Sequence, residues 1–165
     1  MKNYILASLL LFSLQTALAQ NDSIQPPYKR FPTFPPIKLL LADSSYFTKD
    51  DLNKKNAILL MLFSPDCDHC QHETEELIKN INQFKTVQII MATVMPFQDM
   101  KAFRDKYGLA THRNIIVGRD QQYFLPVFFN IRTLPFLAFY NRKKELISVF
   151  EGSMPIHKVL EELKK

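Results

Sequence analysis

The sequence contains little of what marks several classes of protein. It has only 2 cysteines in 165 residues, no internal repeat and no low-complexity tract. Charged residues make up 22% of the chain and apolar residues 47%, which excludes both a disordered chain and a protein with several membrane spans. The 21 basic and 16 acidic side chains are mixed, and the basic runs at residues 142–144 and 164–165 are too short to follow a phosphate backbone. We therefore expect a globular domain that does not bind nucleic acid.

The first 19 residues have the three parts of a secretory signal peptide. Lys2 is followed by an apolar run at residues 5–14 and by the triplet Ala17, Leu18 and Ala19, in which Ala17 and Ala19 are small. The apolar run is too short to cross a bilayer comfortably as a permanent helix. We expect residues 1–19 to be a signal peptide and the protein to be exported, to the periplasm or another extracytoplasmic space. Membrane attachment is expected only if this segment is retained as an anchor.

Residues 20–36 form a polar segment that is rich in proline. Because proline fixes extended backbone, we expect an N-terminal arm that cannot form helix. Three aromatic residues alternate with the prolines and can pack on the domain, namely Tyr28, Phe31 and Phe34. The arm is therefore expected to be a tether or to lie along an edge of the domain.

Strand and helix patterns alternate over residues 37–165, which we predict to be one domain. Apolar runs predict strands at residues 37–41, 57–63, 87–95, 115–117, 136–140 and 146–150. The 3.6-residue period predicts a helix through Leu77, Ile78, Ile81 and Phe84. A second helix is predicted to end at Gly108, a third, short helix follows Asp120, and the last helix follows Pro155. Thr48 and Asp51 predict a capped turn. The order gives an α/β fold, a βαβ half followed by a ββα half, with helices on both faces of a mixed sheet.

Both cysteines lie in one motif, Cys67-Asp68-His69-Cys70, directly after a buried strand and at the start of a helix. The free backbone amides and the dipole at a helix N-terminus favour the thiolate, which is the reactive form of cysteine. A purely structural disulfide is the alternative, but closing a four-residue loop stabilises a protein by only about 2 kcal/mol, against roughly 5 for a long loop. The placement of the motif favours redox chemistry.

Charged residues around the motif are expected to modulate it. Asp66 and Asp68 flank Cys67 and oppose its thiolate, whereas a protonated His69 favours it, so the effects nearly cancel. Glu73 lies three residues after Cys70, and the helix period places both on the side that faces the core. A carboxylate there can accept and return the proton of the second thiol. An ordinary first-turn glutamate, stabilised by the helix dipole, is the alternative.

Metal binding is a second use for the same residues. His69 and His72 would add two ligands to the two cysteines. These side chains point in different directions if they lie on one helix, since residues 70 and 72 are about 200° apart around the helix axis. A closed site needs a ligand from elsewhere, and nothing in the sequence places His112 or His157 nearby. Haem attachment is excluded because Gln71, not histidine, follows the second cysteine.

Together with the cysteine motif, the segment at residues 130–136, which contains Leu134 and Pro135, resembles a conserved loop of the thioredoxin family. The resemblance covers residues 37–165. The signal segment, the position of Glu73 and the inserted residues 95–129 are similar to the TlpA/ResA type of extracytoplasmic thiol-disulfide oxidoreductase. The resemblance implies a thioredoxin-like fold with an N-terminal extension and a central insertion. It also implies a cis Pro135 beside the cysteines and a Leu134 backbone that pairs with a bound substrate strand.

Three positions depart from the family pattern. Asp66 stands where tryptophan is frequent, and the chain has no tryptophan. Met61 occupies the position of the buried aspartate of thioredoxin, which leaves Glu73 as the candidate for its role. Glu75 replaces a proline usual in the TlpA type. A peroxiredoxin is disfavoured because residues 63–65 lack the threonine that those enzymes place before their reactive cysteine.

The prediction is therefore an exported enzyme that exchanges disulfides with protein substrates and with a redox partner protein, without a cofactor. Cys67 attacks, Cys70 resolves the mixed disulfide and Glu73 assists proton transfer, while Leu134 and Pro135 bind substrate. The alternative is a thioredoxin-fold chaperone that carries copper or zinc without redox turnover.

Overall fold

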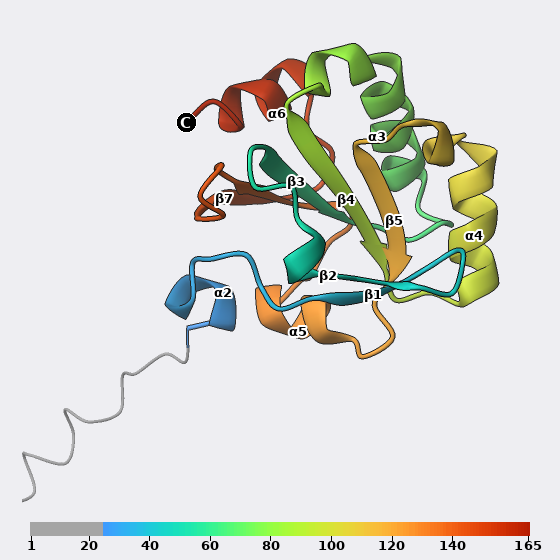
Figure 1. The fold of residues 1–165 in the computed structure, drawn as a ribbon, viewed down its shortest axis with the longest axis horizontal. Helices are drawn as coiled ribbons and strands as arrows, with labels where there is room; N and C mark the ends of the chain where they lie inside the picture. The colour runs from blue at the N-terminus through green and yellow to red at the C-terminus, as the bar shows by residue number, and fades with distance from the viewer. Residues whose placement is uncertain (1–24) are drawn as a thin grey trace, which may run out of the picture.

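The computed structural model describes residues 25–165, so the predicted signal peptide lies outside the described residues. One seven-stranded sheet has the order β2-β1-β5-β4-β3-β6-β7 (Figure 1). Its strands are β1 (Lys38–Leu41), β2 (Tyr46–Thr48), β3 (Ala57–Leu62), β4 (Val87–Thr93), β5 (Ile115–Arg119), β6 (Phe136–Tyr140) and β7 (Leu146–Glu151). The helices are α2 (Pro27–Arg30), α3 (Asp68–Lys79), α4 (Phe97–Lys106), α5 (Phe124–Phe129) and α6 (Ile156–Glu162).

The sheet is mixed, as the sequence predicted. β3, β4 and β5 are parallel, whereas β6 pairs antiparallel with β3 and β7, and β1 pairs antiparallel with β2 and β5. Every residue of β3, β4 and β6 is buried, because both faces of the sheet are covered. The α/β fold class is confirmed.

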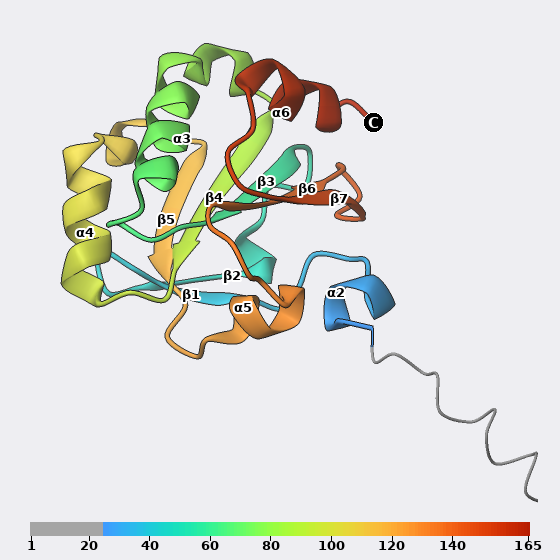
Figure 2. The same ribbon diagram turned by 180° about the vertical axis from the view of Figure 1, so that it is seen from behind.

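Alternate residues of the central strands point into two separate cores. The α3 face buries side chains of α3, α4 and α6 against Leu59, Met61 and their neighbours. The arm face buries Phe34 and side chains of α5 against Leu60, Leu62 and their neighbours. Figure 2 shows α3 and α4 together on one side, with α5 and α2 below. Successive side chains of a strand point to opposite faces of the sheet, so continuous apolar strands make both faces apolar. Both faces therefore need helices to cover them.

The arm corrects one prediction, because residues Pro27–Arg30 form a single helical turn, α2. A proline fits the first position of a helix, where its missing N–H has no partner to lose. Phe34 is fully buried, and its ring centroid lies 5.0 Å from that of Tyr140. Phe31, in contrast, is 59% exposed. The arm therefore packs on the domain through Phe34 and Tyr28, whereas the side chain of Phe31 is exposed.

Backbone hydrogen bonds also hold the arm. The N–H of Phe34 donates to the carbonyl of Lys144 at 2.8 Å, and that of Leu146 donates to the carbonyl of Pro32 at 2.8 Å. The ammonium group of Lys144 donates to the carbonyls of Asn53 and Asn56, both at 2.6 Å. The turn between β6 and β7 thus joins the arm to the residues before β3.

Other element predictions hold with changed ends. The helix predicted through Phe84 stops at Lys79 and resumes as a 3-10 turn, η3 (Ile81–Phe84). Asn80 accounts for the break, because its side-chain amide donates to the carbonyl of Glu76 at 2.9 Å. β5 runs to Arg119, beyond the predicted residues 115–117, and β2 was not predicted.

The predicted capped turn at Thr48 forms, and Asp120 binds the start of α5, whose N-cap residue is Tyr123. The carboxylate of Asp51 accepts the N–H of Thr48 at 2.8 Å before the short 3-10 turn η2 (Lys49–Asp51). That of Asp120 accepts the N–H of Leu125 at 2.7 Å in α5. Among residues 25–165, no helix has the length and apolar composition needed to cross a membrane.

Candidate active site

The two cysteines lie at the start of α3, in different surroundings. Cys67 is the N-cap residue and is partly exposed, whereas Cys70 is fully buried one turn later. Both thiols are free, and the N–H of Cys70 donates to Sγ of Cys67 at 3.3 Å. A backbone amide that points at a sulfur stabilises its thiolate. The first sulfur is therefore accessible and the second lies behind it.

A segment from the other half of the chain lies beside Cys67. The thiol of Cys67 donates to the carbonyl oxygen of Leu134, with 3.8 Å between sulfur and oxygen. The bond between Leu134 and Pro135 is cis, and Pro135 is buried. The structure thus has the cis proline that the resemblance implied, and the residue before it contacts Cys67.

Glu73 faces the core, as its spacing predicted. The residue is 2% exposed, and its Oε2 accepts the N–H of Met154 at 2.9 Å, while Oε1 is buried without a partner. Burial raises the pKa of Glu73, and the hydrogen bond from Met154 offsets part of that rise. Met154 was not expected here, because it contributes a backbone N–H that no side-chain pattern reveals.

The environment of Cys70 keeps its thiol protonated. Burial is the largest cause that raises the pKa of Cys70, followed by its hydrogen bond with Cys67. The negative charge of Glu73 raises the pKa of Cys70 further. Cys70 therefore needs a nearby base before it can act as a nucleophile.

The three predicted modulating residues, Asp66, Asp68 and His69, lie on the exposed side of the motif. No side chain of these three forms a hydrogen bond with a cysteine in the described part of the chain. Their charges act on Cys67 through solvent, where interactions are screened. The hydroxyl of Ser153 donates to the carbonyl of His69 at 3.2 Å and joins α3 to the segment before α6.

A hollow of about 560 Å³ opens beside Glu73, and we call it the Glu73 hollow. It is lined by His72, Glu73, Ser153, Met154 and His157 among others. His157 was not expected near the motif, and the turn of the chain into α6 brings it there. Within residues 25–165, no three side chains of histidine, cysteine, aspartate or glutamate are grouped so that they would hold a metal ion.

A second hollow, of about 220 Å³, lies beside Leu134 at the carboxyl ends of β3 and β4. We call it the Leu134 hollow, and Phe63, Thr93, Tyr123 and Arg132 are among its other lining residues. Ligands of α/β proteins bind at the carboxyl ends of parallel strands. Sequence reasoning missed Tyr123, because it lies in a loop without periodicity.

Comparisons with known proteins bear on the fold. No family model and no curated protein matches the chain. Among solved structures, a thioredoxin-type protein from Neisseria meningitidis is 20% identical over 79% of this chain and 86% of that one, with a TM-score of 0.65. A secreted disulfide oxidoreductase of Mycobacterium tuberculosis, homologous to E. coli DsbE, is 16% identical over 78% of this chain and 95% of that one, with a TM-score of 0.65. This chain has a thioredoxin-like fold.

The thioredoxin-like fold does not by itself specify a reaction. A peroxiredoxin-like protein from Aquifex aeolicus also matches, at 12% identity over 80% of this chain and 84% of that one, with a TM-score of 0.63. The chemistry must therefore be argued from the site. In this thioredoxin-like fold the site consists of one accessible sulfur, one buried sulfur, a buried carboxyl and a cis-proline loop.

Proposed function

We propose that this chain is an exported thiol-disulfide oxidoreductase that acts on proteins. The observation that carries the proposal is the unequal pair of sulfurs at the start of α3. Cys67 is reachable, and its Sγ lies 3.3 Å from the N–H nitrogen of Cys70 and 3.8 Å from the carbonyl oxygen of Leu134. Cys70 is 0% exposed and out of a substrate's reach. Such a pair suits attack by one sulfur and resolution by the other.

The first step is attack by the thiolate of Cys67 on a substrate disulfide. The substrate S–S bond breaks, a mixed disulfide forms with Cys67, and the leaving sulfur takes a proton from solvent. The loop at Leu134 and Pro135 holds the substrate, because an exposed main-chain edge binds an extended peptide through backbone hydrogen bonds.

The second step is resolution by Cys70. The carboxylate of Glu73 accepts the proton of Cys70, whose sulfur attacks Sγ of Cys67 and expels the second substrate sulfur. Two electrons pass from the protein to the substrate, and the protein keeps the new disulfide between Cys67 and Cys70. No cofactor is required, because a redox partner protein restores the dithiol by the reverse exchange. In the opposite direction the same steps oxidise a substrate.

Two cysteine variants of the full-length protein test the proposal. We expect Cys67→Ala to abolish disulfide exchange with a protein substrate, and Cys70→Ala to accumulate a mixed disulfide that is visible by non-reducing electrophoresis. Equal trapping by both variants would contradict the assigned roles. Stoichiometric copper or zinc that survives dialysis, in a protein without exchange activity, would favour the metal chaperone instead.

A further inference from the structure

The Leu134 hollow is connected to a larger apolar depression through one side chain, Tyr123. The larger depression, which we call the arm hollow, has a volume of about 750 Å³ and is lined by Phe31, Phe34, Lys49, Tyr123, Phe124 and Val127 among others. Tyr123 lines both hollows. Together they make a surface that leads from the Cys67 side of the molecule, past Leu134, to α2 and α5.

The apolar side chains on this surface are unusually exposed. Five large apolar side chains of residues 25–165 are exposed, and three of them line the arm hollow, namely Phe31 at 59%, Tyr123 at 57% and Val127 at 66%. Exposed apolar side chains that gather in one patch mark a binding surface, whereas scattered ones need no explanation.

The backbone at Tyr123 supports the same interpretation. Tyr123 has φ 58° and ψ 28°, a left-handed conformation that is rare for a bulky residue. The strain orients an aromatic ring toward solvent, where the ring contributes little to folding. Strained conformations of this kind persist where they position a side chain for binding.

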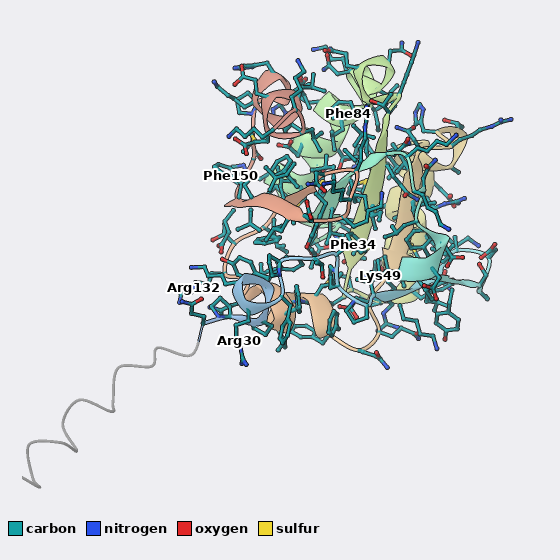
Figure 3. All side chains as sticks on the ribbon, turned by 60° about the vertical axis from the view of Figure 1, so that its left-hand side comes forward. Arg30, Phe34, Lys49, Phe84, Arg132 and Phe150 are labelled. Carbon is teal, nitrogen blue, oxygen red and sulfur yellow. The ribbon has the colours of Figure 1, made fainter. Side chains whose placement is uncertain are left out.

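Charge further defines what the surface accepts. Arg132 lines the Leu134 hollow and Lys49 lines the arm hollow, while no acidic side chain of residues 25–165 lines either. Arg30 lies with its guanidinium carbon 5.6 Å from the ring centroid of the exposed Phe31. Figure 3 shows Arg30 and Arg132 on the part of the molecule around α2, with Phe150 apart from them near β7.

We infer that the Leu134 hollow and the arm hollow together recognise the substrate of the proposed exchange reaction. The substrate is an extended protein segment with aromatic or large aliphatic side chains and acidic side chains next to its reactive cysteine. Tyr123 is the specificity-determining residue between the two hollows. This inference rests on the proposed function and identifies its substrate class.

Geometry is the reason for assigning these hollows to the substrate. A substrate sulfur bonded to Cys67 lies beside Leu134, because the carbonyl oxygen of Leu134 is 3.8 Å from Sγ of Cys67. The residues next to the substrate cysteine therefore pass over the hollow that Leu134 itself lines. An apolar side chain there is removed from water, and a carboxylate there approaches Arg132.

Three peptides that differ at two positions test the inference. In each peptide, the single cysteine forms a mixed disulfide with thionitrobenzoate. The two residues on either side of this cysteine are Phe and Asp in the first peptide, Ser and Asp in the second, and Phe and Lys in the third. In single-turnover reactions of the reduced protein, we expect the second-order rate constant for thionitrobenzoate release to be about 10-fold higher with Phe and Asp than with Ser and Asp, because burial of an aromatic side chain favours binding by at least that factor. The Phe and Lys peptide should react more slowly than the Phe and Asp peptide.

Matched variants assign the preference to the surface. Tyr123→Asn should reduce the preference for phenylalanine at least several-fold, and asparagine keeps the left-handed backbone at low cost. Arg132→Gln should reduce the preference for aspartate and its dependence on salt. Phe150→Ser removes an exposed apolar side chain outside both hollows and should leave both preferences unchanged. Equal rates with all three peptides would overturn the inference.

The failure of the inference can be told apart from failure of the proposed function. Exchange with a small aromatic disulfide, Ellman's reagent, needs Cys67 but neither hollow. A protein that reacts with Ellman's reagent through Cys67 but ignores the peptide flanks retains the proposed function and loses the inferred specificity. A protein whose Cys67 does not exchange with Ellman's reagent loses both.

The occupant of the arm hollow can be identified directly. Benzoylphenylalanine at position 127 of the full-length protein should cross-link on irradiation to the Phe and Asp peptide, and the Ser and Asp peptide should compete poorly. Cross-links to a second copy of the chain would instead make the surface a dimer interface. Cross-links to residues 1–24 would make it a binding site for the protein's own N-terminus. Either of these two results would overturn the inference.

Discussion

The two faces of the sheet use the same strands for different purposes. On the α3 face, long helices cover the core. Cys70 is fully buried there and Glu73 is almost fully buried. On the arm face, the cover consists of a six-residue helix, α5, and the arm, and it leaves apolar side chains exposed in the arm hollow. Leu134 packs against both cores.

The difference shows how one fold separates chemistry from recognition. Burial on the α3 face raises the pKa values of Glu73 and Cys70, because a protein interior disfavours the charged form of each group. Recognition needs the opposite condition, since an apolar side chain binds a partner only if it is exposed beforehand. The closed face thus suits proton transfer, and the open face suits docking.

The largest effect should come from removing the main contact of the arm. Phe34→Ala is expected to lower the free energy of unfolding by about 3–5 kcal/mol, because Phe34 is fully buried against Tyr140. Phe84→Ala, on the α3 face, should cost a similar amount. Urea denaturation measures both, and Phe31→Ala is the exposed control, with an expected change within about 0.5 kcal/mol. A decrease of less than about 1 kcal/mol in the free energy of unfolding of Phe34→Ala would show that packing of the arm does not stabilise the arm face.

The next effect concerns the second step of the exchange. Glu73→Gln should lengthen the lifetime of the mixed disulfide about 100-fold at neutral pH, because the resolving thiol loses its base. The first step, measured as formation of the mixed disulfide in quenched-flow experiments, should change much less. Glu75→Gln, an exposed position on the same helix, is the control. A uniform slowing of both steps would indicate a structural role for Glu73 instead.

A smaller effect should appear in the pH dependence of stability. Burial raises the pKa of Glu73 above its ordinary value of 4.5, so the folded protein binds its proton more tightly than the unfolded chain does. The stability that this proton contributes is complete below pH 4.5 and is lost as pH rises through the folded pKa. Glu73→Gln should therefore gain stability relative to the native protein between pH 4 and pH 8, as measured by urea unfolding in parallel. A constant difference across this range would contradict the assigned pKa direction.

The smallest effect is expected from the exposed charges. His69→Ala should slow alkylation of Cys67 by iodoacetamide, and Asp68→Asn should accelerate it, each by less than about 5-fold, since exposed charges interact weakly through water. Both differences should shrink in 1 M salt, where charges are strongly screened. A change of 50-fold in either variant would mean that one of these side chains contacts the sulfur directly.

The sequence predicted what depends on local patterns. Continuous apolar runs located the buried strands β3 and β4, and the helix period placed Glu73 on the core side below Cys70. The loop at Pro135 was predicted from its resemblance to a family, since spacing alone does not bring it to Cys67.

What the sequence did not predict depends on contacts between distant segments. The helical turn α2 is stabilised by packing of Tyr28 on Phe129, with ring centroids 5.6 Å apart, a contact that no local pattern contains. Tyr123 owes its place to a left-handed backbone that tyrosine rarely adopts. His157 reaches the Glu73 hollow only because α6 folds back beside α3.

The Glu73 hollow has one more consequence. It shares no lining residue with the Leu134 hollow or the arm hollow. A protein docked over the Leu134 hollow and the arm hollow therefore contacts none of the residues that line the Glu73 hollow. In the proposed reaction, the proton that Glu73 accepts from Cys70 would then have a side of the molecule for its exit that the substrate does not cover.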